Sequence, residues 1–268
     1  MKMTNKQIIF KISLMAVFSA LSFALTYVSI PLPTGAKVHL GNFVCTLAAL
    51  LCGGIVGGAS GAIGMGLNDI VSGYGWSTIV RTIIVKFLFG FVVGFLFQLL
   101  VKKEKGTKAL MISLSAIFDI LFVVFLILSI TGTLTLNIGD ATKEFTVSVL
   151  CPILLGIIGL SLTVATFLLN KLKGVNRVVL AVSSIGVLVN IVFEFILRWL
   201  LKGIELGGGV AGFNTSLVDS ITKLPSNFIT GIATVIITLL VYLPLYKALT
   251  TTGFSKYIIN SEDEKELN

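Results

Sequence analysis

Charged residues are scarce in this chain, since Asp, Glu, Lys and Arg together make up only 12% of its 268 residues. Soluble domains carry about 25% charged residues. Here the hydrophobic fraction is 56% and the mean hydropathy is +1.04. No polar stretch is long enough to form a soluble domain of useful size, so we expect a protein that lies almost entirely in a lipid bilayer.

The motifs of several enzyme classes are missing as well. There is no GxxxxGK[ST] phosphate loop, so the chain itself is not expected to hydrolyse ATP. His39 is the only histidine and HExxH is absent, which argues against a histidine-based zinc site. GxSxG is also absent. Cys45, Cys52 and Cys151 form no CxxC pair and are expected to be small packing residues. We expect no enzyme activity, no metal and no cofactor.

Long apolar runs dominate what is present. Runs of about 20 residues with few charges are candidates for helices that cross a ~30 Å hydrocarbon core. Eight such runs occur, at 8–30, 40–56, 57–72, 77–101, 109–131, 146–170, 178–201 and 226–249. The two runs within 40–72 are short. The pattern predicts an all-α, polytopic transmembrane helix bundle that forms one integral membrane domain over residues 1–268.

Basic residues are clustered between these runs, within a net charge of +8. With eight spans, all four clusters fall on one side of the membrane. The positive-inside rule then places both termini in the cytoplasm of a multi-pass cell-membrane protein. Nucleic acid is not an expected partner, because the charges sit in short loops beside the membrane. The clusters are Lys2, Lys6 and Lys11; Lys102, Lys103, Lys105 and Lys108; Lys171, Lys173 and Arg177; and Lys247 and Lys256.

Small residues recur at a spacing of four, which lets helix backbones approach closely in lipid. The glycine series is expected to pack within the protein: Gly53, Gly57 and Gly61; Gly54 and Gly58; and Gly90 and Gly94. A second stripe, Ala16, Ala20 and Ala24, lies on the first span. This stripe could pack inside the fold or against another protein, and the sequence leaves both alternatives open.

Polar and ionisable side chains gather near one end of the predicted bundle. Such groups are costly inside a membrane, so each is a functional candidate. Lys86 lies roughly 13 Å into its span at 1.5 Å per residue, and Asn190, Glu194 and Arg198 share one helix face because they are four residues apart. The candidate substrate contacts are Lys37, His39, Asn42, Asn68, Asp69, Tyr74, Trp76, Arg81, Lys86, Asn190, Glu194 and Asn227.

These groups predict a small-ligand pocket with mostly apolar walls and a few placed polar groups. The alternative is that Glu194–Arg198 and Asp69–Arg81 are structural ion pairs, and that Tyr74 and Trp76 are aromatic residues of the membrane interface. Asp119 lies near mid-membrane, away from the others in sequence, and receives no predicted role.

Two segments carry a family resemblance. The segment KVHLGNFVCTLAALLCGGIVGGASGAIGMGLNDIVSGYGW, followed by a span that contains Lys86, resembles the S components of energy-coupling factor (ECF) vitamin transporters. The segment LPSNFITGIATVIITLLVYLPLYKAL resembles their last helix. The similarity covers roughly 10–105 and 178–250 and is closest to the riboflavin, hydroxymethylpyrimidine and pyridoxine branch.

The resemblance implies a six-helix core with an outward-facing substrate site, covered by a loop at Ser29–Val38 and bordered by a loop at 203–223. It also implies docking of the Ala16, Ala20 and Ala24 stripe on a transmembrane T subunit, which works with two ATPase subunits. Here the core would be 8–105 and 178–250, with an inserted helix pair at about 109–172.

We therefore expect the substrate-binding membrane subunit of an ECF-type ABC transporter that takes up a vitamin or vitamin precursor. One alternative is a stand-alone secondary transporter or channel, although the two halves show no convincing inverted repeat. Another is an intramembrane enzyme that uses Asp69 or Glu194 as acid or base, although no paired catalytic motif supports it.

Overall fold

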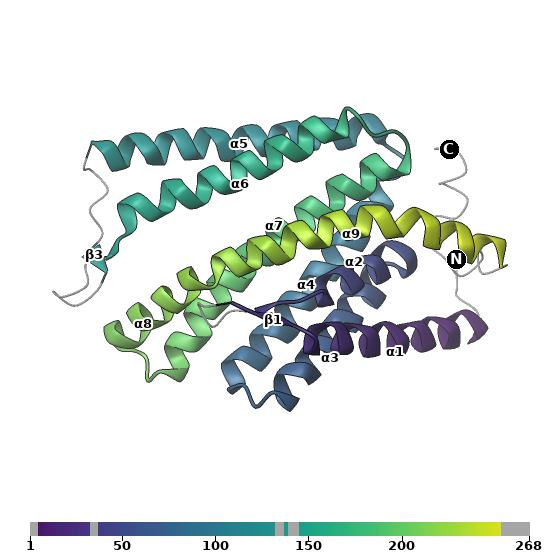
Figure 1. The fold of residues 1–268 in the computed structure, drawn as a ribbon, viewed down its shortest axis with the longest axis horizontal. Coiled ribbons are helices and arrows are strands. Elements are labelled where there is room, and N and C mark those ends of the chain that lie inside the picture. Colours follow the sequence, from purple (N-terminus) through teal and green to yellow (C-terminus); the bar gives the residue numbers. More distant parts are fainter. Residues whose placement is uncertain (1–4, 33–36, 132–136, 139–144, 253–268) are drawn as a thin grey trace. The chain divides into compact units, whose positions relative to one another are not determined.

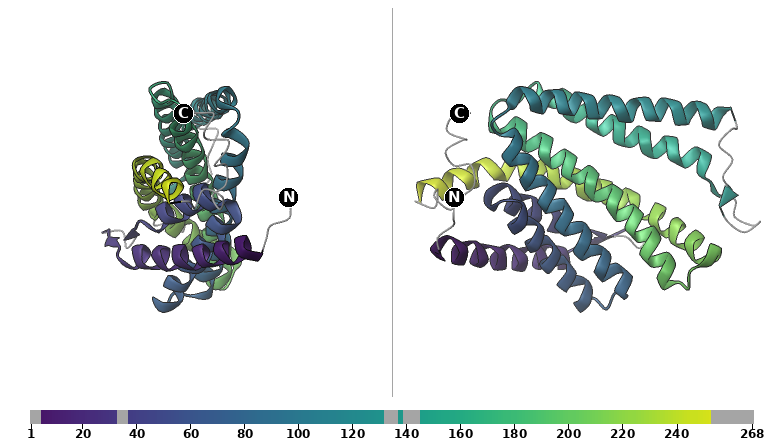
Figure 2. Two further views of the ribbon diagram at one scale, coloured as in Figure 1. Left: turned by 90° about the vertical axis from the view of Figure 1, so that its right-hand side faces the viewer. Right: turned by 180° about the vertical axis from the view of Figure 1, so that it is seen from behind.

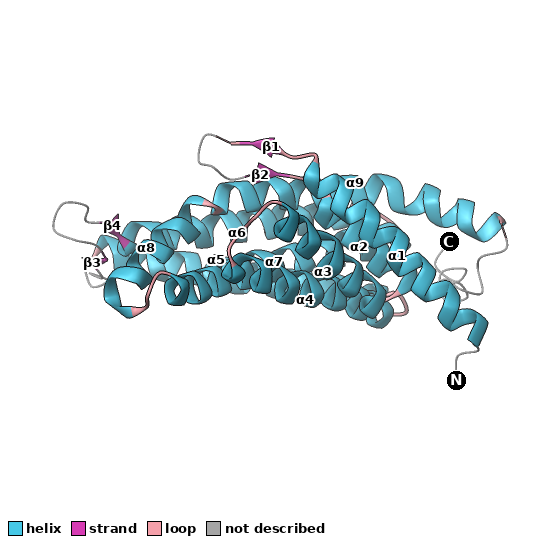
Figure 3. Ribbon diagram, turned by 90° about the horizontal axis from the view of Figure 1, so that it is seen from below, coloured by secondary structure: helices cyan, strands magenta, loops and turns pink. Residues whose placement is uncertain are grey.

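Almost every residue that the structure describes is helical, and strands are confined to two short antiparallel pairs (Figure 3). The computed structural model describes residues 5–32, 37–131, 137–138 and 145–252. The all-α prediction is confirmed. The elements are α1 Asn5–Tyr27, β1 Ile30–Pro31, β2 Lys37–Val38, α2 Gly41–Cys52, α3 Gly54–Val71, α4 Trp76–Leu100, α5 Glu104–Ile130, β3 Asn137–Ile138, β4 Phe145–Thr146, α6 Val147–Leu169, α7 Val175–Glu205, α8 Gly209–Thr222 and α9 Leu224–Thr251 (Figure 1).

Six of the described helical stretches, not eight, are long and apolar enough to cross a membrane. They are α1, α4, α5, α6, α7 and the nearly continuous stretch of α8 and α9. Each predicted run does form a helix. However, α2 has only 12 residues, about 18 Å of helix, which is too short for a ~30 Å core. The chain is a multi-pass membrane protein, and the prediction of eight full spans is wrong.

The short pair α2 and α3 forms a tight antiparallel hairpin. Gly53 makes the turn with a φ of 96°, a conformation that side chains with a Cβ rarely adopt. Beyond it, Gly57 packs against Ala49 and Gly61 against Cys45. A closed hairpin returns the chain to the end from which it came. The later helices therefore keep the directions expected from an even number of spans.

Glycines also form the seam between α3 and α4. A Cβ added at Gly90 would meet the backbone of Gly58, and one at Gly94 would meet the backbone of Gly54. The helix axes can approach this closely only because these positions carry no side chain. The prediction that the glycine series packs within the protein is confirmed.

The chain divides into two compact units, one of residues Lys103–Lys173 and the other of the chain on either side of it. In the smaller unit, α5 and α6 lie side by side in all views as an antiparallel pair (Figure 2). In the larger unit, the core is built mainly from α2, α4, α7 and α9, with single contributions such as Phe18 from α1, and its largest fully buried side chains include Leu50, Phe89, Phe97 and Tyr242. The predicted insertion at about 109–172 falls in the smaller unit.

Most of residues 203–223 are helical, in the end of α7 and in α8, which corrects the prediction of a loop for this stretch. Helix α7 continues to Glu205, and Gly207, Gly208 and Gly209 reverse the chain with positive φ angles. Helix α8 then packs back on α7, where the Ser216 hydroxyl donates to the carbonyl of Trp199 at 2.5 Å. Pro225 lies in the first turn of α9, where a missing backbone N–H costs nothing.

Candidate ligand-binding site

A cavity of about 270 Å³ lies at one end of the larger unit. The residues that line it come from the ends of α1, α3, α7 and α8, the starts of α2 and α9, the first turns of α4, the turn between α3 and α4, and the segment that leads into α2. They are Thr26, Lys37, His39, Asn42, Met65, Asn68, Asp69, Tyr74, Thr78, Arg81, Thr82, Lys86, Glu194, Arg198, Lys202, Asp219, Lys223, Ser226, Asn227 and Thr230. Met65 alone among them has no polar or ionisable group suited to strong hydrogen bonding. The prediction of mostly apolar walls is therefore wrong, because all but one of the residues that line the cavity are polar or ionisable.

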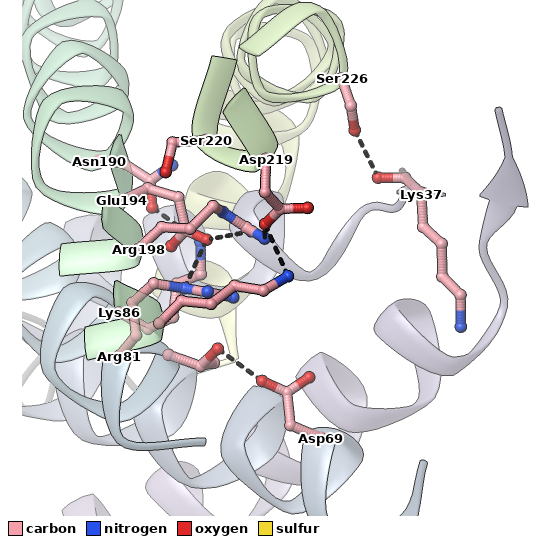
Figure 4. A network of polar contacts seen from close by, with 12 residues as sticks. Lys37, Asp69, Arg81, Lys86, Asn190, Glu194, Arg198, Asp219, Ser220 and Ser226 are labelled. Carbon is pink, nitrogen blue, oxygen red and sulfur yellow. Dashed lines mark hydrogen bonds and ion pairs between the residues drawn. The ribbon is translucent and has the colours of Figure 1, made fainter. Parts of the chain in front are cut away.

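An ion-pair network joins α4, α7 and α8 along one wall of this cavity (Figure 4). The Nε atom of Arg81 lies 2.8 Å from Oε1 of Glu194, and Nη2 of Arg198 donates to the same oxygen at 2.9 Å. Arg198 and Lys202 both reach Oδ2 of Asp219, at 3.4 and 3.0 Å. Because α4 and α7 run antiparallel, Arg81 and Glu194 meet at one depth although 113 positions separate them.

Lys86 lies more than one turn deeper along α4 and is buried. Its Nζ donates to Oδ1 of Asn190 at 2.7 Å, across the contact between α4 and α7 (Figure 4). An ammonium group has three donors, and the acceptor here is a neutral amide. A buried cation is tolerated only where hydrogen bonds or opposite charge offset its desolvation. Lys86 is therefore the deepest positive group that the cavity offers to a ligand.

Five buried atoms of cavity-lining residues make no hydrogen bond to the described residues. They are Oδ1 of Asn42, Nδ2 of Asn68, Oε2 of Glu194 and the Nε atoms of Arg81 and Arg198, of which Nε of Arg81 is ion-paired with Glu194. Leaving such a group unpaired costs about 1–3 kcal/mol. Two acceptors and two donors, Nδ2 of Asn68 and Nε of Arg198, are thus available to a polar molecule that enters the cavity.

Asp69 does not pair with Arg81, which corrects that part of the structural alternative. Its Oδ2 accepts from the Thr82 hydroxyl at 2.5 Å, whereas Arg81 pairs with Glu194. The other proposed pair, Glu194 with Arg198, is present. Both carboxylates still line the cavity, so they are structural groups and parts of its wall at the same time.

His39 forms a neutral part of the wall just before α2. Its Nδ1 accepts from the backbone N–H of Gly41 at 3.3 Å. Burial lowers the pKa of His39 from 6.5 to about 4, and the positive charge of Lys86 acts in the same direction. His39 therefore adds no positive charge to the cavity at neutral pH.

The segment that leads into α2 is attached to the start of α9. The Ser226 hydroxyl donates to the Lys37 carbonyl at 2.7 Å (Figure 4). The Lys37 ammonium lies 5.6 Å from the centre of the Tyr74 ring, at the cavity rim. The predicted covering loop, Ser29–Val38, is described only at 29–32 and 37–38, since residues 33–36 lie outside the described part of the chain.

The family model described as ECF-type riboflavin transporter, S component, matches residues 6–173, which is more than half of the chain. The chain belongs to this family. It is the substrate-binding subunit of an ECF-type transporter for vitamin uptake. Comparisons with curated proteins and with solved structures found no match. The family match includes the cavity-lining residues from Thr26 to Lys86. The lining residues of α7, α8 and α9 follow the matched region in the sequence.

Ten of the twelve predicted substrate contacts of this S component line the cavity. The two exceptions are Trp76, which is half exposed at the start of α4, and Asn190, which lies behind Lys86 as its hydrogen-bond acceptor. That these twelve residues contact substrate remains a prediction.

Sequence reasoning missed several cavity residues: Thr26, Met65, Thr78, Thr82, Lys202, Asp219, Lys223, Ser226 and Thr230. The spacing Glu194, Arg198, Lys202 was a usable signal for one of them, since these residues continue one face of α7 at intervals of four. Asp219 carried no local signal, because it reaches the cavity only through the reversal between α7 and α8.

The alanine stripe of this S component faces outward. Ala16, Ala20 and Ala24 are exposed, whereas Phe18 and Ser22 on the other side of α1 are buried against the bundle. Of the two alternatives left open by the sequence, packing of the stripe inside the described fold is excluded.

Proposed function

We propose that the cavity is the substrate site of this S component and that it opens toward the outside of the cell membrane. The observation that carries the proposal is the meeting of buried charges and unpaired polar atoms around one cavity: Lys86, Arg81, Glu194, Asn42 and Asn68. Such groups converge where a polar ligand is bound.

The direction of the helices supports the outward orientation. Helix α1 ends and α9 begins at the cavity, so the first and last described residues, Asn5 and Thr252, lie toward the opposite end. At that opposite end, Lys102 follows the last residue of α4 and Arg177 lies in the first turn of α7. By the positive-inside rule that end is cytoplasmic. The termini themselves, including Lys2 and Lys256, lie outside the described residues.

Transport then requires partners: a transmembrane T subunit and two ATPase subunits, since the chain has no phosphate loop of its own. The exposed stripe of Ala16, Ala20 and Ala24 is the proposed docking face for the T subunit, because small residues let a partner helix approach closely. In this role the chain binds and delivers substrate and catalyses no reaction.

The family's six-helix core corresponds in this proposal to α1, α2, α3, α4, α7 and α8–α9. The pair α5 and α6 is then an insertion, supported by its separation into a compact unit of its own. The matched residues run through both helices, so a deletion tests the point. Replacing residues 106–172 with a short polar linker should leave substrate binding in the larger unit intact.

The experiment has two arms. In the first, the purified chain is titrated with riboflavin, pyridoxine, hydroxymethylpyrimidine, thiamine, biotin and folate, with their phosphorylated forms included, and saturable binding is expected. In the second, uptake into proteoliposomes is measured with and without a T subunit and ATPases, and only the complete complex should transport. Binding together with uptake that needs no partner would replace the proposal with a stand-alone transporter.

A matched pair of variants tests the docking face. Ala20→Leu should weaken co-purification with the T subunit while substrate binding stays unchanged, because the added bulk keeps a partner helix at a distance. Leu21→Ala, a change at the neighbouring exposed position of α1, serves as the control. Equal loss in both variants would remove the stripe from the docking face.

A further inference from the structure

The cavity carries a surplus of positive charge. Its lining holds three acidic groups and six basic groups, and His39 is neutral at physiological pH. The lining therefore carries a net charge of +3. The acidic groups are Asp69, Glu194 and Asp219, and the basic groups are Lys37, Arg81, Lys86, Arg198, Lys202 and Lys223.

The three carboxylates are already engaged within the protein. Glu194 contacts Arg81 and Arg198 through one oxygen, Asp219 contacts Arg198 and Lys202, and Asp69 accepts from Thr82. Lys86, by contrast, has the neutral Asn190 amide as its acceptor. The surplus therefore extends to the buried floor of the cavity, where water screens charge least.

The walls offer little to a neutral aromatic ring. Pockets for such ligands are lined mainly by apolar and aromatic side chains. Here the lining has one apolar residue, Met65, and two aromatic rings, the neutral imidazole of His39 and the phenol of Tyr74, which lies at the rim beside Lys37. Trp76 is not part of the lining.

We propose that the substrate of this S component carries an acidic group, a phosphate or a carboxylate, which is bound at the floor of the cavity by Lys86 with the help of Arg81. This inference rests on the proposed function of the cavity. It assigns the chain to anionic vitamins or phosphorylated vitamin forms rather than to neutral riboflavin. The rim residues Lys37 and Lys202 then raise the local concentration of such anions and speed their entry.

The test uses ligand pairs that differ only in the acidic group. The full chain is placed in nanodiscs of zwitterionic lipid and titrated with riboflavin and riboflavin 5′-phosphate, pyridoxine and pyridoxine 5′-phosphate, panthenol and pantothenate, and nicotinamide and nicotinate. In the pair that binds, the acidic member should bind roughly tenfold to a hundredfold tighter, as charge-assisted hydrogen bonds would give. Competition by inorganic phosphate or by acetate then separates a phosphate from a carboxylate site.

A variant pair ties the preference to Lys86. Lys86→Gln keeps a polar side chain without the charge and should abolish most of the preference for the acidic ligand while the neutral member keeps its affinity. Lys247→Gln, an exposed lysine toward the other end of α9, should behave as wild type. If Lys86→Gln does not fold, the salt dependence of the wild-type affinities serves instead: only the acidic member should weaken as salt rises from 50 to 500 mM.

Two results would overturn the inference in distinguishable ways. A neutral member that binds as tightly as its acidic counterpart, or tighter, overturns the charge preference and leaves the cavity as the substrate site. Absence of binding by every compound to chain shown to be folded overturns the proposed function of the cavity and the inference together.

Discussion

Both units of this S component hold polar side chains within apolar helices, but they use them differently. In the smaller unit, Oδ2 of Asp119 accepts from Thr163 at 2.8 Å and from Ser115 at 3.3 Å, so side chains of α5 and α6 themselves supply hydrogen bonds to this carboxylate. In the larger unit, Arg81, Glu194 and Lys86 line a cavity, and Oε2 of Glu194 has no partner there.

The difference lies in whether the hydrogen-bonding capacity is used up locally. The Asp119 cluster joins α5 to α6, and Gly159 packs directly against the carboxylate because it has no Cβ. Such a group is explained by helix association in lipid. The cavity network has capacity left over, in charge and in hydrogen bonds, which a structural role does not require. An intramembrane charge thus indicates a ligand only where its neighbours do not satisfy it.

The largest expected effect is on substrate binding, from Lys86→Ala. Removing the buried ammonium should weaken binding roughly 100-fold, about 3 kcal/mol, while expression stays intact. Isothermal titration with the best ligand of the vitamin panel measures it, and Lys247→Ala is the matched control at the other end of the bundle. Unchanged affinity would remove Lys86 from the site and make it a structural group like Asp119.

The next effect is on stability, from Glu194→Gln. This change leaves Arg81 without its counter-ion, whereas Arg198 keeps Asp219, and an uncompensated buried charge costs about 3 kcal/mol. Thermal unfolding in detergent should show a clearly lowered midpoint. A midpoint within one degree of wild type would mean that the network is as dispensable as a surface ion pair.

A pH effect of intermediate size is expected from His39. His39 binds a proton near pH 6.5 in the unfolded chain but only near pH 4 in the native state. The contribution of His39 to stability is therefore fully present above pH 6.5 and is lost as the pH falls toward 4. The loss should be about 2 kcal/mol, since His39 is only partly shielded from solvent. Unfolding is measured between pH 7.5 and 4 in wild type and His39→Gln. Parallel curves for the two would show that His39 does not contribute.

The smallest effect is expected from Asp119→Asn. The amide keeps one acceptor oxygen for Ser115 and Thr163, so stability should fall by about 1 kcal/mol or less. Substrate affinity should stay at the wild-type value, since Asp119 does not line the cavity. A loss of binding in this variant would break the contrast between the two units.

The helices were predictable because they depend on local properties. Each of the eight apolar runs forms a helix, and the spacing of the glycines predicted that they pack within the protein, although not which helices they join. Two local predictions failed. Helix α2 is too short to span the hydrocarbon core of a membrane. The stretch 203–223, predicted as a loop, instead contains the end of α7 and helix α8, which packs back on α7 because three glycines with positive φ reverse the chain between them.

The site was only partly predictable. Polar and ionisable side chains within or beside the apolar runs pointed to ten of the cavity residues, since such groups are costly in a membrane and therefore conspicuous. The partners were not accessible: Arg81 pairs with Glu194 rather than with Asp69, and Trp76 stays outside the cavity. Pairing depends on which helices become neighbours and at what depth, and no local pattern states that.

By itself, the sequence determined that this protein lies in a membrane and that its fold is an all-α bundle of membrane-spanning helices with basic residues clustered between them. It also determined which family the protein resembles. Hydropathy, charge placement and small-residue spacing are properties of single segments, so they can be read without a fold. Only the tertiary structure decided that the pocket is polar and positively charged. Its walls come from residues as far apart as Thr26 and Thr230, and their charges add up only once packing has brought them around one cavity.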